Sequence, residues 1–154
     1  MHDLAKFRRY AKKVKIFQGL EPEEVAFILH CGQELYFRAN TTIFHEGMLG
    51  TNLFVVLSGK VAIYHKNEFI ATCHVGDAFG EMAVLNRKPR TATATAITEC
   101  RVFTLEEKRM NEILDKHVAV RLLLNIIHVI SERLEGANKE NTRLHKLLKQ
   151  AGIS

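Results

Sequence analysis

A change in the spacing of apolar residues, which begins near residue 33 and reverses near residue 106, constrains the fold most. Between these points apolar and polar side chains alternate in short runs, and turn-forming residues separate the runs roughly every 8 to 12 positions. Outside them, apolar residues recur at helical spacing. The sequence therefore predicts an α+β fold that is mainly β: a jelly-roll (double-stranded β-helix) barrel flanked by short N-terminal helices and a long C-terminal helix.

These limits also predict the domain organisation. We expect an N-terminal helical segment (1–32), a β-roll (33–105) and C-terminal helices (106–150). Pro22 suits the first turn of a helix, and Gly32 is expected to end that helix as its C-terminal cap. Strands are expected at 35–37, near 43, and at 53–57, 61–64, 69–72, 91–97 and 101–105.

The β pattern is interrupted at residues 79–94, which read FGEMAVLNRKPRTATA. Gly80 permits a tight turn and a close backbone approach to a ligand. A one-turn helix after it would direct the unpaired N–H groups of Met82 and Ala83 towards an anion. This segment is therefore the candidate binding site.

The second half of the segment adds donors for the same anion. Pro89 fixes the loop before Arg90, whose planar guanidinium suits a phosphate diester, and Thr91 adds a hydroxyl. Glu81 is an acceptor beside this anion site. An acceptor in that place suits a ligand that also carries a hydroxyl donor, as a ribose does.

Residues 79–94 resemble the phosphate-binding cassette of the cyclic nucleotide-binding domain family, which reads Phe-Gly-Glu-aliphatic-Ala-aliphatic, a spacer, and Pro-Arg-small-Ala-Thr. The hairpin at 56–61, Gly76-Asp77 and Ile16-Phe17 also match, so the resemblance covers residues 10–140 in order.

The resemblance implies that Arg90 and the N–H groups of Ala83 and Thr91 hold a cyclic phosphate. It also implies that Glu81 and the Gly80 backbone hold the ribose 2′-hydroxyl. The alternative is a surface loop in which Arg90 only forms an ion pair with Glu81.

The purine is left open between cyclic AMP and cyclic GMP. In the family, a hydroxyl residue at the position of Thr91 favours guanine in some members and serves the phosphate in bacterial cyclic AMP receptors. Those receptors also resemble the helix around Arg133, but they carry threonine and serine where Ala137 and Asn138 stand. The Asn138 amide can both donate and accept. We favour cyclic AMP.

The final predicted helix, residues 117–149, carries an apolar seam. Its members step alternately by three and four residues between 120 and 148, as in the a and d positions of a coiled coil. Asn141 at an a position favours a parallel, in-register homodimer, and Gly136 marks a possible bend. The alternative is a helix that lies back on its own barrel. The seam comprises Val120, Leu123, Ile127, Ile130, Leu134, Ala137, Asn141, Leu144 and Leu148.

The net charge of +5 resides in the first 15 residues, because the remaining charges balance. Leu4, Phe7, Ala11 and Val14 recur there at helical spacing. One interpretation is contact with nucleic acid or an anionic membrane surface; the other is a helix packed by its apolar stripe. We expect no nucleic-acid contact by this chain alone.

Other functions lack their motifs. No run is long and apolar enough to span a membrane, and no secretory signal is visible. The three cysteines are widely spaced, which favours reduced thiols in the cytoplasm. The eight histidines show no metal-ligand spacing, and there is no nucleophile–base arrangement or P-loop. We expect that the chain is not an enzyme and that it binds no metal ion or cofactor. Alternatives to a sensor are a fragment of a DNA-binding regulator and a ligand-free dimerisation scaffold.

Overall fold

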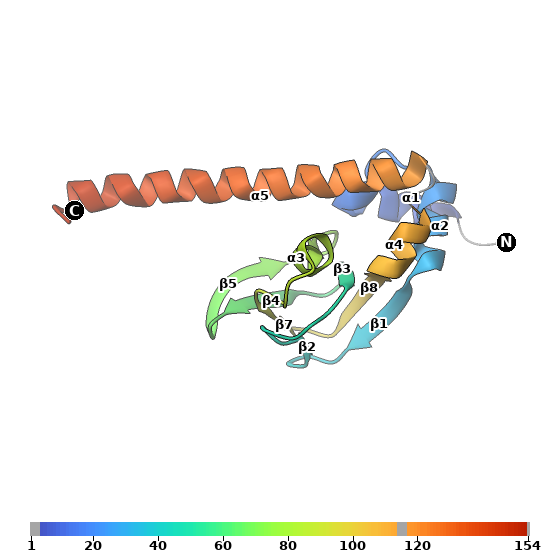
Figure 1. The fold of residues 1–154 in the computed structure, drawn as a ribbon, viewed down its shortest axis with the longest axis horizontal. Helices are drawn as coiled ribbons and strands as arrows, with labels where there is room; N and C mark the ends of the chain where they lie inside the picture. Colours follow the sequence, from blue (N-terminus) through green and yellow to red (C-terminus); the bar gives the residue numbers. More distant parts are fainter. Residues whose placement is uncertain (1–3, 114–116, 154) are drawn as a thin grey trace.

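The computed structural model describes residues 4–113 and 117–153. Two four-stranded antiparallel sheets form the roll, with strand orders β1-β8-β3-β6 and β2-β7-β4-β5 (Figure 1). The predicted mainly β jelly-roll with flanking helices is confirmed. The strands are β1 (Gln33–Phe37), β2 (Thr42–Phe44), β3 (Asn52–Ser58), β4 (Val61–His65), β5 (Glu68–Cys73), β6 (Ala78–Phe79), β7 (Thr93–Ala96) and β8 (Cys100–Glu106).

The helices lie outside the two sheets (Figure 1). The short helix α3 lies between the roll and α5, and α1, α2 and α4 gather at the N-terminal end of α5. They are α1 (Leu4–Lys13), the 3₁₀ helix η1 (Lys15–Phe17), α2 (Pro22–Cys31), α3 (Glu81–Asn86), α4 (Glu107–Ile113) and α5 (His117–Gln150).

Strand β3 separates two apolar clusters and is buried on both faces. Phe54 and Val56 join the cluster inside the roll, whereas Leu53, Val55 and Leu57 join the cluster between the sheet and the helices. Successive side chains of a strand point to opposite faces, so a strand buried on both sides needs a continuous apolar run. The run at 53–57 thus reflects the helical layer over β3.

Helix α2 begins and ends by different means. Pro22 is its first residue, and the Glu24 carboxylate accepts the N–H of Glu21 at 2.8 Å, which caps the first turn. Gly32 follows its end, but with φ −116° and ψ −161° it is extended. The predicted end of the helix at Gly32 is confirmed, although the residue does not adopt a left-handed conformation. A side chain at Gly32 would instead collide with the Phe103 ring and the Thr104 carbonyl, so close packing explains the glycine.

The basic N-terminal helix α1 is packed against the body. Tyr10 is buried, Phe7 and Ala11 are partly buried in the same cluster, and Val14 is fully buried just beyond the helix. The packed-helix interpretation is therefore confirmed for these residues, whereas the side chain of Leu4 lies outside the described residues. No described helix is long and apolar enough to span a membrane.

Helix α5 has two different halves. Ala119, Leu122, Ile126 and Val129 are buried against the helical layer. From residue 131 every residue of α5 is exposed, and the helix projects past the roll (Figure 1). The helix continues through Gly136 without interruption, so the suggested bend is not observed.

Candidate functional site

The cassette begins where β6 turns into α3. Gly80 makes this turn with φ +76°, a left-handed conformation that glycine adopts without strain. A side chain here would also lie 2.7 Å from the Arg90 guanidinium. The predicted one-turn helix at 81–86 is confirmed as α3. Strand β7 begins at Thr93, two residues later than expected, because Thr91 and Ala92 belong to the cassette loop and line the cavity.

Arg90 is held inside the protein, with only 5% of its surface exposed. Its Nη1 donates to the Gly80 carbonyl at 2.9 Å, and its Nη2 donates to the Asn52 carbonyl at 3.0 Å. Its guanidinium also lies 4.3 Å from the centre of the Phe44 ring and 5.5 Å from that of Phe54. These contacts fix the side chain before any ligand arrives.

Burial lowers the pKa of the Arg90 guanidinium, and the Glu81 carboxylate acts in the opposite direction. An arginine remains charged at neutral pH despite such a shift. Among the ion pairs of the described residues, none neutralises Arg90 with a carboxylate. The site therefore keeps a buried positive charge whose fixed partners are carbonyl oxygens and aromatic rings.

Glu81 does not pair with Arg90, so the surface-loop alternative with an Arg90–Glu81 ion pair is wrong. Its Oε1 lies 2.6 Å from Nη1 of Arg133 on α5, and Arg133 also donates to the Ala78 carbonyl. The Glu81 side chain is 12% exposed and that of Arg133 is 41% exposed. The cassette and the long helix are thus joined by a partly buried ion pair.

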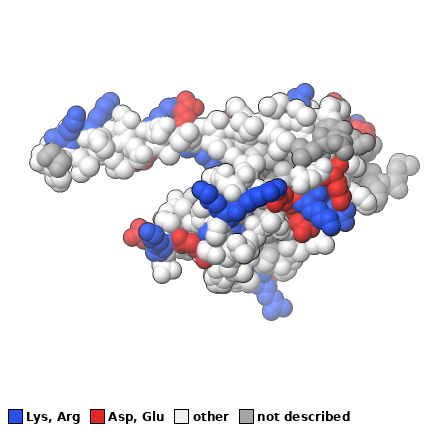
Figure 2. All heavy atoms as spheres, in the orientation of Figure 1, with Lys and Arg blue, Asp and Glu red and all other residues white. Residues whose placement is uncertain are grey.

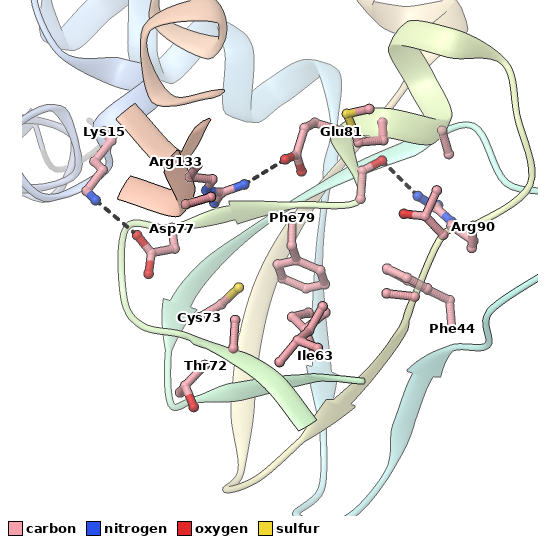
Figure 3. A pocket seen from close by; sticks show the side chains of 18 residues that line it. Lys15, Phe44, Ile63, Thr72, Cys73, Asp77, Phe79, Glu81, Arg90 and Arg133 are labelled. Atoms are coloured by element: carbon pink, nitrogen blue, oxygen red, sulfur yellow. Dashed lines mark hydrogen bonds and ion pairs between the residues drawn. The ribbon is translucent and has the colours of Figure 1, made fainter. Parts of the chain in front are cut away.

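A cavity of about 660 Å³ opens beside these groups (Figure 3). Eight of the nine predicted site residues line it: Gly80, Glu81, Met82, Ala83, Arg90, Thr91, Arg133 and Ala137. Asn138 is not among the lining residues; its carbonyl accepts the hydroxyl of Thr142 within the exposed part of α5.

Several lining residues were not among the predicted site residues. Phe44, Ile63 and Phe79 supply an apolar wall, and Phe44 and Phe79 stack with ring centres 6.0 Å apart (Figure 3). Cys73 lies on the same wall, where burial raises the pKa of its thiol to about 11. A neutral thiol and apolar side chains suit the flat face of an uncharged ring system.

A second ion pair lies at the margin of the cavity. Lys15 Nζ is 3.5 Å from Asp77 Oδ1, and both residues line the cavity (Figure 3). The other oxygen of Asp77 accepts the N–H of His74 at 2.9 Å, which fixes the turn before β6. The sequence analysis named Asp77 only as part of the resemblance, and its pairing with Lys15 arises from the packing of η1 against the turn at Gly76.

The site combines a fixed cation, a carboxylate acceptor and an apolar wall. This arrangement can hold a small ligand with an anionic group, a hydroxyl and a flat ring. Within residues 4–113 and 117–153, no three His, Cys, Asp or Glu side chains gather in a way that could hold a metal ion. The fold and site define a ligand-binding β-roll domain.

The chain belongs to the cyclic nucleotide-binding domain family, whose model matches residues 34–117, more than half of the chain. It is thus a regulatory binding domain and not an enzyme, as the sequence predicted. A CRP-like cAMP-activated global transcriptional regulator of Mycobacterium tuberculosis is 32% identical over 129 residues. The match covers 80% of this chain, and the chain spans 56% of that relative.

Solved structures agree with this assignment. The catabolite activator protein of Thermus thermophilus is 29% identical with a TM-score of 0.75, and the match covers 85% of this chain and 63% of that one. A structure of PKAR CBD2 with Sp-2Cl-cAMPS bound is 27% identical with a TM-score of 0.68, over 98% of this chain and 95% of that one. The chain therefore shares its fold with a catabolite activator protein and with a domain that holds Sp-2Cl-cAMPS.

Proposed function

We propose that the chain binds a cyclic nucleotide, cyclic AMP in preference to cyclic GMP, in the cavity beside α3. The observation that carries this proposal is the buried guanidinium of Arg90, which is positioned at the cavity and has no carboxylate partner among the described ion pairs. A cyclic phosphate supplies the missing negative charge. The N–H groups of Ala83 and Thr91 add neutral donors to the same anion.

Glu81 receives the ribose. Its carboxylate accepts the 2′-hydroxyl, with the Gly80 backbone beside it, and so distinguishes a ribose from a deoxyribose. Because Glu81 Oε1 already pairs with Arg133, the ligand either shares this carboxylate or displaces the arginine. In both cases ligand binding alters the contact between the cassette and α5.

The preference for cyclic AMP is supported by two comparisons. The mycobacterial relative is cAMP-activated, and the PKAR CBD2 structure contains a cAMP analogue. In this chain Thr91, Arg133 and Ala137 line the cavity, whereas Asn138 does not. We therefore assign contacts with the base to Arg133 and Ala137 first, and to Asn138 only if α5 shifts on binding.

We further propose a parallel homodimer through residues 120–148. Apolar members of the seam are exposed in the single chain, as for Ile127 at 56% and Leu134 at 61%. In the view of Figure 2, most of the charged side chains on the projecting part of α5 lie along its upper edge. A second copy of the helix covers the exposed members of such a seam, whereas Leu123 and Ile130 are already partly buried against the chain's own core.

Ligand and dimer are coupled through α5 in this proposal. A cyclic nucleotide interacts differently with docked and undocked positions of the helix, which is the requirement for a population shift. Binding then orders residues 130–150 and tightens the dimer, and dimerisation raises ligand affinity by the same factor.

A cytoplasmic location remains a prediction, supported by the free thiols of Cys31, Cys73 and Cys100.

A second candidate is the sensing part of a DNA-binding regulator. It is favoured by the mycobacterial transcriptional regulator, of which the chain spans 56%. Both candidates require the same ligand site.

Equilibrium titration with cyclic AMP, cyclic GMP and 2′-deoxy cyclic AMP tests the proposed site. We expect cyclic AMP to bind most tightly, and Glu81→Ala to reduce the difference between the ribose and deoxyribose ligands. Absence of binding by all three would leave only the dimerisation scaffold.

A further inference from the structure

His65, at the end of β4, contacts the cassette from outside the cavity. Its Nδ1 lies 3.0 Å from the carbonyl oxygen of Thr91 and 3.0 Å from Oε1 of Glu46. A carbonyl and a carboxylate are both acceptors, so Nδ1 carries the hydrogen and donates it between them. The tautomer of His65 is therefore set by its surroundings.

Glu46 ties His65 into a small network. Its Oε2 accepts the N–H of Lys66 at 2.9 Å, and its own N–H donates to the Thr93 hydroxyl at 2.9 Å. Through its carboxylate and its backbone N–H, Glu46 thus joins the hairpin turn after β4 to the cassette where the cassette enters β7. This network lies directly behind Thr91.

Two hydrogen bonds fix the peptides on both sides of Thr91. The Arg90 carbonyl accepts the N–H of Gly47 at 2.8 Å, and the Thr91 carbonyl accepts from His65. In a trans peptide the C=O and N–H point in opposite directions. The N–H groups of Thr91 and Ala92 are therefore aimed away from Gly47 and His65, and both residues line the cavity.

We propose that His65 is a positioning residue of the phosphate site: through the Thr91 carbonyl it orients the backbone that meets the anionic group of the ligand. This inference rests on the proposed function, because it assumes an anion at Arg90 and Thr91. His65 itself does not touch the ligand.

The arrangement gives ligand affinity a pH dependence of defined sign. Glu46 faces His65 from the loop after β2, Glu68 lies opposite it across the β4–β5 hairpin, and Lys66 is its neighbour. The cassette contributes the Thr91 carbonyl, beside Arg90. Protonation of His65 strengthens its hydrogen bond to Glu46 and brings a positive charge near the anionic group of the ligand. Affinity for the anionic ligand is then higher when His65 is protonated than when it is neutral.

Calorimetric titration of the full chain with cyclic AMP at pH 8 and pH 6 tests the proposal. We expect wild-type affinity to be about threefold higher at pH 6, and His65→Ala to weaken binding about threefold to tenfold at pH 6. His65→Asn keeps a neutral donor near Nδ1, so it should restore most affinity at pH 8 without the dependence on pH. Glu46→Gln should reduce the dependence, and the exposed His30→Asn should retain it.

The outcomes separate the two proposals. If the wild-type chain binds no cyclic nucleotide, the proposed function fails. If it binds, but His65→Ala shows wild-type affinity at both pH values, the function stands and the role of His65 is rejected. Circular dichroism of each variant verifies that it is folded.

Discussion

Glu81 of the cassette and Arg133 of α5 form an ion pair with 2.6 Å between Oε1 and Nη1. The pair joins the residue assigned to the ribose with the helix assigned to the dimer. Arg133 also follows Val129, the last buried apolar residue of α5, by one turn. Arg133 therefore lies where the buried stripe of α5 ends and the helix begins to project past the roll, and among the described residues of α5 beyond it only Ala137 lines the cavity.

Replacement of Arg133 should release this part of α5. In Arg133→Leu without ligand, we expect amide hydrogen exchange at residues 129–137 to accelerate about tenfold, because an ion pair and a hydrogen bond to the Ala78 carbonyl are lost. Exchange mass spectrometry measures this. Arg143→Leu is the matched control, since Arg143 pairs with Glu140 on the same helix. Equal exchange in both variants would contradict a link through Arg133.

Much of the fold was predictable because local patterns determined it. The change in the spacing of apolar residues located the roll. Helix α3 has the expected limits, and α5 begins at the expected residue and ends one residue later than expected. The partners of Arg90 and Glu81 were not predictable, because they depend on contacts between distant elements. Phe44 and Asn52 meet Arg90 only when β2 and β3 are assembled beside the cassette. The close packing around Gly32 was not predictable for the same reason, since its neighbours on β8 are distant in sequence.

Phe44 should contribute to ligand affinity through Arg90. Phe44→Leu keeps an apolar side chain but removes the ring beneath the guanidinium, 4.3 Å away. We expect cyclic AMP binding to weaken about threefold to tenfold, as for the loss of a partly desolvated cation–π contact. The control is Phe69→Leu on the exposed hairpin, which should bind as wild type. Titration calorimetry compares the two, and equal affinities would reject a role for the ring.

Charges within the seam should abolish the dimer. Leu134→Lys with Leu144→Lys places two positive charges at positions that face the partner helix, and the double variant should sediment as a folded monomer. Glu135→Lys adds positive charge at an adjacent position outside the seam and should remain dimeric. A wild-type monomer at tens of micromolar would contradict the proposed dimer.

Cys73 should make the folded state sensitive to alkali. Burial raises the pKa of its thiol from 9.0 to about 11, so the folded protein retains a proton that the unfolded chain loses. The stabilising contribution is complete below pH 9 and is lost as pH rises towards 11. Urea unfolding at pH 8 and pH 10.5 should therefore show a smaller decrease in unfolding free energy for Cys73→Ala than for wild type. Equal decreases would contradict the burial of this thiol.

Calorimetric titration of wild type and Arg90→Ala with cyclic AMP tests the central claim most directly. Arg90→Ala also leaves the Gly80 and Asn52 carbonyls without their donor, so circular dichroism must first verify that the variant is folded. We expect saturable wild-type binding with one site per chain. The folded variant should bind about 30-fold to 1,000-fold more weakly, as the loss of a charge-assisted contact worth about 2–4 kcal/mol requires. Wild-type affinity in Arg90→Ala would contradict the assignment of the phosphate to this cavity.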